Sequence, residues 1–126
     1  MVQCQSLSKT FFDPKRGKIE AVTDATLLAK DGAITGLLGA NGAGKTTTLR
    51  MLSTLIKPDA GSASVAGFEV GKQDQDIRKS IGFLSSSTAL YGRLTTREML
   101  QYFGSLYDMA PVDVDNEIAK ITEVLA

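Results

Sequence analysis

The chain has 126 residues, 43% of them hydrophobic, and its 14 Lys and Arg residues balance 14 Asp and Glu residues. This length suits one ordinary domain, and the neutral charge without a long basic run argues against direct nucleic-acid binding. One cysteine and no histidine exclude an internal disulfide and a Cys/His zinc site. The sequence has no apolar signal segment and no apolar run of the ~20 residues that cross a bilayer, so we expect a protein that is neither secreted nor membrane-spanning.

The first elements expected are β-strands. Residues 2–7 alternate weakly between apolar and polar side chains, and residues 19–22 form a second β-prone run beyond a basic turn at 13–18. Together they predict an antiparallel hairpin. Residues 25–29 predict a third strand. Residues 33–38 are almost continuously apolar, which predicts a strand buried on both faces.

Helices and strands are expected to alternate after this point. Apolar residues between 49 and 56 predict a helix that ends before Pro58, because proline breaks a helix and restricts the residue before it. Residues 62–66 predict a strand, 74–79 a short polar helix, and 81–84 another strand. This order of elements is typical of an α/β protein.

Two further helices are predicted near the C-terminal end. Thr95 and Glu98 match the capping box, which predicts a helix from about residue 96 to 107. After Pro111, apolar residues recur at intervals of four, three and four residues, which predicts a second helix. These residues are Val114, Ile118, Ile121 and Leu125.

Residues 39–46 carry a complete P-loop pattern, Gly-x-x-x-x-Gly-Lys-Thr, between a predicted strand and a predicted helix. Gly39, Gly42 and Gly44 let the backbone adopt conformations that are closed to other residues. The loop amides, including that of Ala43, can then approach phosphate oxygens closely and form an anion-binding nest. The alternative interpretation is a Gly-rich turn beside an exposed lysine.

Four side chains complete the predicted phosphate site. Lys45 adds a full positive charge that can reach the β- and γ-phosphate oxygens, and Thr46 can bind Mg²⁺ through its hydroxyl. Thr47 can donate hydrogen bonds to the α-phosphate, while Asn41 lies at the lip of the loop near the γ-phosphate. We therefore predict a site for a nucleoside triphosphate and Mg²⁺, and the P-loop alone leaves GTPases, small-molecule kinases, helicases and transporter ATPases as alternatives.

The surroundings of this loop closely resemble the nucleotide-binding subunit of ABC transporters. The resemblance is carried by residues 36–52, by 57–61 and by the strand that ends at Gly67, and it covers nearly the whole chain. The family's loop is typically G-P-N-G-A-G-K-[ST]-T, and here Ala40 replaces the proline at a position that supplies backbone only. The resemblance implies an α/β fold, a P-loop NTPase (RecA-like) core with an N-terminal antiparallel β-subdomain and an α-helical subdomain.

The same resemblance implies an incomplete cassette. Residues 1–89 correspond to the N-terminal part of the ATPase core and residues 90–126 to the start of the helical subdomain. The signature segment, the second acidic motif and the switch histidine should follow, and the sequence contains none of them. The complete protein is thus expected to hydrolyse ATP with catalytic help from Lys45, whereas the 126 residues alone are expected to bind nucleotide weakly without turnover.

Two more site residues come from the resemblance. Residues 7–11 look like the L-x-K-x-aromatic element that stacks on adenine, which selects Phe11, with Phe12 one position away. Core packing is the alternative role for such an aromatic residue. Ser86 stands where the family has a glutamine that reaches toward Mg²⁺. Because serine is shorter, a water would have to bridge, and the alternative is an ordinary polar loop residue.

The biological role implied is the ATP-binding subunit of a membrane exporter. Residues 46–48 and 88–95 resemble the sodium-extrusion and drug-efflux branch. The partners implied are a transmembrane permease subunit and a second ATP-binding cassette, without nucleic acid, at the cytoplasmic face of the membrane. The alternatives are a soluble ABC-type ATPase that acts on ribosomes or DNA, and a binding-only fragment or another P-loop enzyme.

Overall fold

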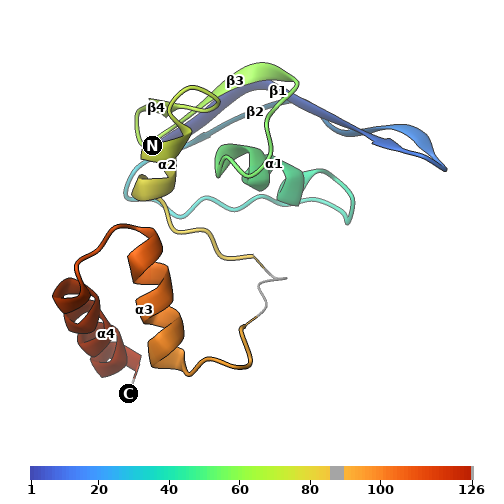
Figure 1. The fold of residues 1–126 in the computed structure, drawn as a ribbon. Coiled ribbons are helices and arrows are strands. Elements are labelled where there is room, and N and C mark those ends of the chain that lie inside the picture. The colour runs from blue at the N-terminus through green and yellow to red at the C-terminus, as the bar shows by residue number, and fades with distance from the viewer. Residues whose placement is uncertain (86–89, 126) are drawn as a thin grey trace. The chain divides into compact units, whose positions relative to one another are not determined.

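A computed structural model of the chain describes residues 1–85 and 90–125. The chain forms two compact units, Met1–Phe83 and Leu84–Ala126. The first unit holds a β-sheet, the P-loop and two helices, and the second holds a pair of helices (Figure 1). The domain boundary predicted after residue 89 borders a segment outside the described residues and stays a prediction.

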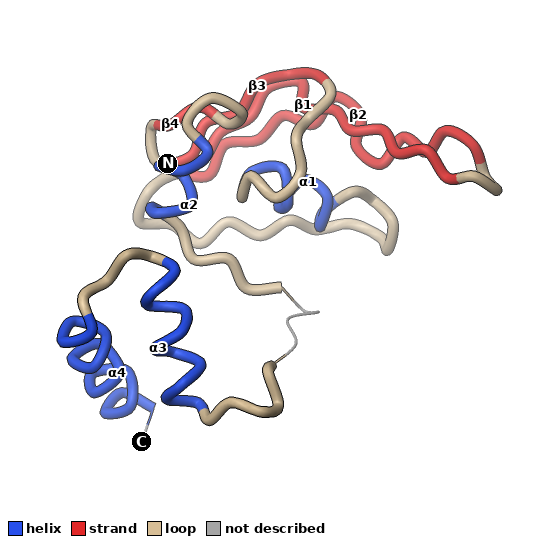
Figure 2. Tube along the Cα trace, viewed as in Figure 1, coloured by secondary structure: helices blue, strands red, loops and turns tan. Residues whose placement is uncertain are grey.

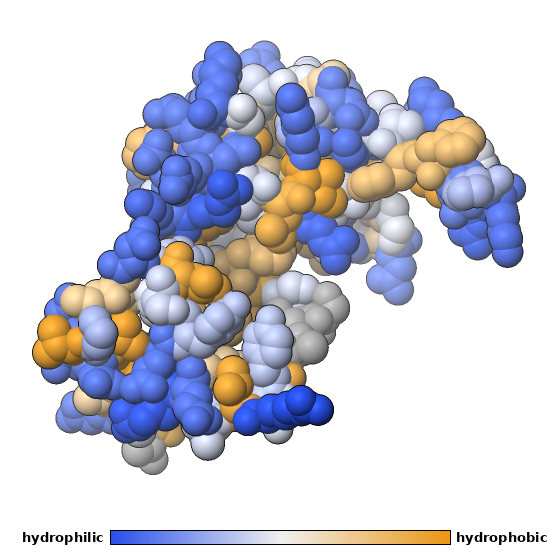
Figure 3. Space-filling model, in the orientation of Figure 1, coloured by the Kyte–Doolittle hydropathy of each residue, from blue (hydrophilic) through white to orange (hydrophobic). Residues whose placement is uncertain are grey.

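The sheet of the first unit is antiparallel throughout the described residues. Its strands are β1 (Val2–Asp13), β2 (Gly17–Ala29), β3 (Ala60–Val65) and β4 (Phe68–Glu69), in the order β2-β1-β3-β4 (Figure 2). The predicted hairpin is confirmed as β1 and β2, and it projects beyond the rest of the sheet. Its tip is hydrophilic (Figure 3), because Lys and Arg side chains are exposed there.

Irregularities within the hairpin decide which side chains reach the core. The separate strands predicted at 19–22 and 25–29 are one strand, β2, which Asp24 interrupts locally with a positive φ of 52°. In β1 the pairing shifts between Cys4 and Leu7, where Ser6 also has a φ of 52°. A bulge reverses the alternation of faces, so Cys4 and Leu7 are both buried although they lie three residues apart.

One face of the sheet packs against helix α1 (Lys45–Leu52), and helix α2 (Asp74–Ser80) adds one fully buried side chain. The helix predicted at 74–79 is thus confirmed. The helix after the P-loop ends at residue 52, earlier than the proline requires. The buried residues that make up this core are Cys4, Leu7, Val22, Met51, Leu52, Ala63, Val65 and Ile77.

Two strand predictions are wrong. Residues 33–38 and residues 81–84 are not in strands, and Ile34 and Leu38 are fully exposed. Their apolar sequences are those of strands buried on both faces, but a strand exists only through hydrogen bonds to a neighbour. Within residues 1–85 and 90–125, no strand pairs with either segment.

The second unit is a helical hairpin of α3 (Thr96–Leu106) and α4 (Pro111–Leu125), so both predicted helices are confirmed. The capping box is also confirmed: Glu98 N donates to Thr95 Oγ1 at 3.3 Å, and Thr95 N donates to Glu98 Oε2 at 2.8 Å. The bond from Thr95 N to Glu98 Oε2, followed by the bond that Thr95 Oγ1 donates to the same oxygen at 2.7 Å, lowers the pKa of the Glu98 carboxyl. None of the helices in the described part of the chain is long and apolar enough to cross a membrane.

Candidate nucleotide-binding site

The P-loop turns into helix α1 through glycines with left-handed backbone. Gly42 has a φ of 84° and Gly44, the N-cap of α1, has a φ of 82°. A Cβ atom on Gly44 would lie 2.4 Å from the carbonyl oxygen of Ala21 and 3.0 Å from Cγ2 of Val22. Only glycine therefore allows both the backbone conformation and the close packing of the loop against β2. This packing fixes where helix α1 begins.

The Lys45 side chain folds back over the loop. Its Nζ donates to the carbonyl oxygen of Gly39 at 2.6 Å and to that of Ala40 at 2.7 Å. At the start of the helix, Thr48 N and Thr48 Oγ1 both donate to the carbonyl oxygen of Gly44, at 2.8 and 3.0 Å. The lysine charge is thus held inside the curve of the loop, at the N-terminal end of α1.

The remaining predicted phosphate ligands lie in the same loop and in the first turn of α1. Ala43 N donates to the carbonyl oxygen of Ala40 at 3.2 Å, which closes the turn at the loop's tip. Asn41 and Thr46 are exposed, and Thr47 is half-buried in the first turn of α1. No side chain of the described residues caps this helix, so the amides of its first turn face outward with the positive end of the helix dipole.

The structure brings Phe11 next to a charged side chain. Phe11 is paired with Ile19 in the hairpin, is 39% exposed, and has the Lys9 ammonium 5.6 Å from its ring centroid. Phe12, the alternative, is 80% exposed and pairs with Lys18. Phe11 is thus packed on one side and open on another, whereas Phe12 projects from the hairpin.

Asp59 is a residue that the sequence analysis did not assign. Its Oδ1 accepts from Lys9 Nζ at 2.7 Å, and its Oδ2 accepts from Thr10 N at 2.8 Å. The bond from Lys9, followed by that from Thr10, lowers the pKa of the Asp59 carboxyl. Because Lys9 and Asp59 are 50 residues apart, no local sequence signal predicts the pair.

Metal ligands are sparse in this site. Ser86, the predicted substitute for the glutamine, lies outside the described residues. Among residues 1–85 and 90–125, no three His, Cys, Asp or Glu side chains gather in a way that could hold a metal ion. The predicted Mg²⁺ ligand Thr46 is exposed in the first turn of α1, and a Mg²⁺ ion commonly takes one or two protein ligands together with phosphate oxygens and water.

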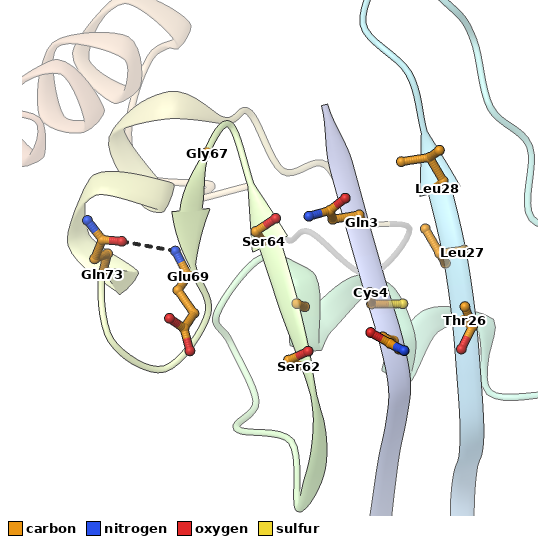
Figure 4. Close-up of a pocket in the computed structure, with 12 residues that line it drawn as sticks. Gln3, Cys4, Thr26, Leu27, Leu28, Ser62, Ser64, Gly67, Glu69 and Gln73 are labelled. Atoms are coloured by element: carbon orange, nitrogen blue, oxygen red, sulfur yellow. Dashed lines mark hydrogen bonds between the residues drawn. The ribbon is translucent and has the colours of Figure 1, made fainter.

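A groove of the first unit lies elsewhere, on the polar face of the sheet (Figure 4). It has a volume of about 940 Å³, and uncharged side chains such as Gln3, Ser62 and Ser64 line most of it. A second cavity of about 330 Å³ is bounded by Lys45 and Thr46 together with apolar residues of α1 and β2. Since phosphate binding needs positive charge and free amides, the P-loop and not the large groove is the candidate site.

Sequence comparisons identify the family. Residues 22–126 match the profile of the ABC transporter family. The chain belongs to the ABC transporter family. It is 39% identical to the ABC transporter ATP-binding protein NatA of Bacillus subtilis over 98% of this chain and 50% of NatA. It is 38% identical to the doxorubicin resistance ATP-binding protein DrrA of Mycobacterium tuberculosis over 86% of this chain and 33% of DrrA.

Solved structures agree with this family. An ATP-binding cassette dimer in a post-hydrolysis state bound to ADP and Pi superposes with a TM-score of 0.72 and 25% identity, over 85% of this chain and 48% of that one. The ATP-binding subunit of an ABC transporter gives a TM-score of 0.72 at 24% identity, over 87% and 44%. The predicted family and fold class are confirmed. The chain spans half or less of the length of these relatives.

Proposed function

We propose that this chain binds the triphosphate of ATP with its P-loop. The observation that carries the proposal is the geometry at the start of α1, where Gly44 packs against β2 and Lys45 is held inside the loop. An N-terminal helix end with outward amides and one fixed cation matches a chain of phosphates in charge and shape. Membership of the ABC transporter family supports the same ligand.

The proposed roles follow the positions of the side chains. Lys45 binds the β- and γ-phosphates, and its charge stabilises the negative charge that moves onto oxygen during phosphoryl transfer. The amides from Gly42 to Thr47 hold the phosphate oxygens, and Asn41 lies at the γ-phosphate end. Thr46 holds Mg²⁺ through its hydroxyl, and the ion neutralises charge on the β- and γ-phosphates when bound. Ser86 stays a candidate at the Mg²⁺ side.

We infer that the complete protein is the ATP-hydrolysing subunit of a membrane exporter. The names of the relatives NatA and DrrA, an ABC transporter ATP-binding protein and a drug resistance ATP-binding protein, support this class. The inferred partners are a transmembrane permease and a second ATP-binding cassette, and the inferred location is the cytoplasmic face of the membrane. The neutral charge supports an exporter over a cassette protein that acts on ribosomes or DNA.

The first test is equilibrium binding of Mg-ATP to the chain and to Lys45→Ala. We expect the variant to lose at least about tenfold in affinity, because the charge that faces two phosphates is removed. Lys72→Ala is the matched control, since Lys72 is an exposed lysine that pairs with Glu69. Equal loss in the two variants, or no loss in Lys45→Ala, would contradict the site.

A second measurement separates binding from turnover and tests the alternative. We expect the 126-residue chain to release no phosphate from ATP, because its sequence does not contain the second acidic motif that the family resemblance assigns to water activation. Phosphate release that Lys45→Ala abolishes would overturn this expectation. Tight binding to duplex DNA or ribosomal RNA at physiological salt would favour a soluble ATPase instead of an exporter subunit.

A further inference from the structure

The Asp59 carboxylate joins the loop after α1 to strand β1 through two hydrogen bonds. It accepts from Lys9 Nζ at 2.7 Å and from Thr10 N at 2.8 Å. The Lys9 ammonium in turn lies 5.6 Å from the ring centroid of Phe11, within the range of a cation–π contact. One carboxylate thus determines where both the backbone before Phe11 and the cation beside its ring lie.

The loop that carries Asp59 is itself fixed to the sheet. Asp59 N donates to the carbonyl oxygen of Ser8 at 2.9 Å, and a Cβ on Gly61 would lie 2.3 Å from the carbonyl oxygen of Ser6. The loop and the start of β3 therefore both lie directly against the bulged part of β1. Lys9 is only 15% exposed, so its ion pair with Asp59 is partly shielded from water, unlike the exposed pairs elsewhere on this unit.

The P-loop touches the same strand pair. Gly44 packs against Ala21 and Val22 of β2, and Val22 is the pairing partner of Lys9. Phe11 follows Lys9 by two residues, which corresponds to about 7 Å along a strand. The end of the phosphate loop and the Phe11 ring, which the family resemblance selects for stacking on adenine, are therefore both positioned relative to the Lys9–Val22 pair of the hairpin.

We propose that Asp59 is a positioning residue for the nucleotide base, acting through Lys9 and the Thr10 amide to hold the Phe11 ring at the distance from the P-loop that adenine requires. The proposal rests on the proposed function, since it presumes that the P-loop binds the triphosphate. With the carboxylate in place, one side of the ring is occupied by the Lys9 cation and the partly exposed remainder is available to a base. Without it, the long Lys9 side chain has no fixed position and the Thr10 N–H loses its acceptor.

The experiment compares a ligand with a base to a ligand without one. Mg-ATP and inorganic Mg-tripolyphosphate are titrated into the full chain and into Asp59→Asn, Phe11→Ala and the double variant. Phe11→Ala should weaken ATP binding by about 5- to 100-fold, the loss expected for one stacked base. Asp59→Asn should weaken it several-fold, and the double variant should bind ATP no more weakly than Phe11→Ala, because both changes remove the same interaction. Tripolyphosphate binding should be unchanged in all three.

Controls separate positioning from folding. Asp76→Asn removes an exposed carboxylate from α2 and should leave both affinities unchanged. Lys9→Met keeps the length of the side chain without the charge and should reproduce the loss in ATP affinity if Asp59→Asn does not fold. Equal loss of ATP and tripolyphosphate affinity, or no loss of either, would overturn the positioning role. If the unaltered chain bound neither ligand, the proposed function would fail and the inference with it.

Discussion

At Gly104 in α3, helix propensity and packing predict opposite effects of an alanine substitution on stability. Alanine in place of glycine within a helix stabilises it by at most about 1 kcal/mol. Here, however, a Cβ would lie 2.6 Å from Cγ2 and 3.0 Å from Cγ1 of Val114 on α4. Val114 is buried and cannot rotate freely, because a β-branched side chain in a helix has one strongly preferred χ1. Overpacking of this kind costs about 1–3 kcal/mol, so we expect Gly104→Ala to destabilise the helical unit by about 1 kcal/mol net.

A double-mutant cycle tests the cause. Val114→Ala alone should cost about 2 kcal/mol by leaving a cavity, and Gly104→Ala combined with it should cost less than the sum, because the new methyl group enters the space that the valine leaves. Hydrogen exchange of the α3 and α4 amides is the suitable assay, since a global melt of two compact units does not report one transition. Stabilisation by Gly104→Ala, or strict additivity in the cycle, would refute the reasoning.

Three other outcomes are expected. Gly44→Ala should lose Mg-ATP affinity and at least about 1 kcal/mol of stability, because of its left-handed φ and the contact with Ala21. Gly42→Ala has open space around it and should lose less stability; equal losses of hydrogen-exchange protection in the first unit would contradict this. Thr95→Ala should destabilise α3 by about 1 kcal/mol through loss of the cap, as protection of its first amides would report. Folding lowers the pKa of Glu98, so its capping contribution to the stability of α3 should be complete above pH 4.5 and should decline as the pH falls through the folded-state pKa. A pH profile of α3 amide protection that Thr95→Ala leaves unchanged would disprove this.

Local signals predicted the helices and the P-loop well. The capping box at Thr95 and Glu98 consists of residues three apart, so the sequence contains the whole interaction. The strand expected at 33–38 depends instead on neighbouring strands. Its apolar composition suits a strand that is covered on both faces, but no strand within residues 1–85 and 90–125 pairs with it. In β2, the positive φ of Asp24 marks a bulge, whereas the sequence reads as a break between two strands.

The candidate site likewise has a part that a local pattern predicts and a part that depends on contacts between distant residues. The phosphate loop is a continuous segment with its own signature, and its glycines have the backbone conformations that the signature requires. The contact between Lys9 and Asp59 joins residues 50 positions apart, and it depends on how the loop after α1 returns to β1. A sequence pattern therefore predicts the groups proposed to touch the ligand more readily than the groups proposed to hold them in place.

In the proposed phosphate site, we expect ligand capture to be an exchange of hydrogen-bond partners at Lys45. The ammonium already donates two short hydrogen bonds within its own loop, so an incoming anion must compete with Gly39 and Ala40 for that charge. A lone chloride or monophosphate offers little compensation for giving up both carbonyls. A polyphosphate also engages the amides along the loop, and the combined contacts can displace the tether. We therefore expect the loop to discriminate among anions by how many of its groups each anion can contact rather than by charge alone.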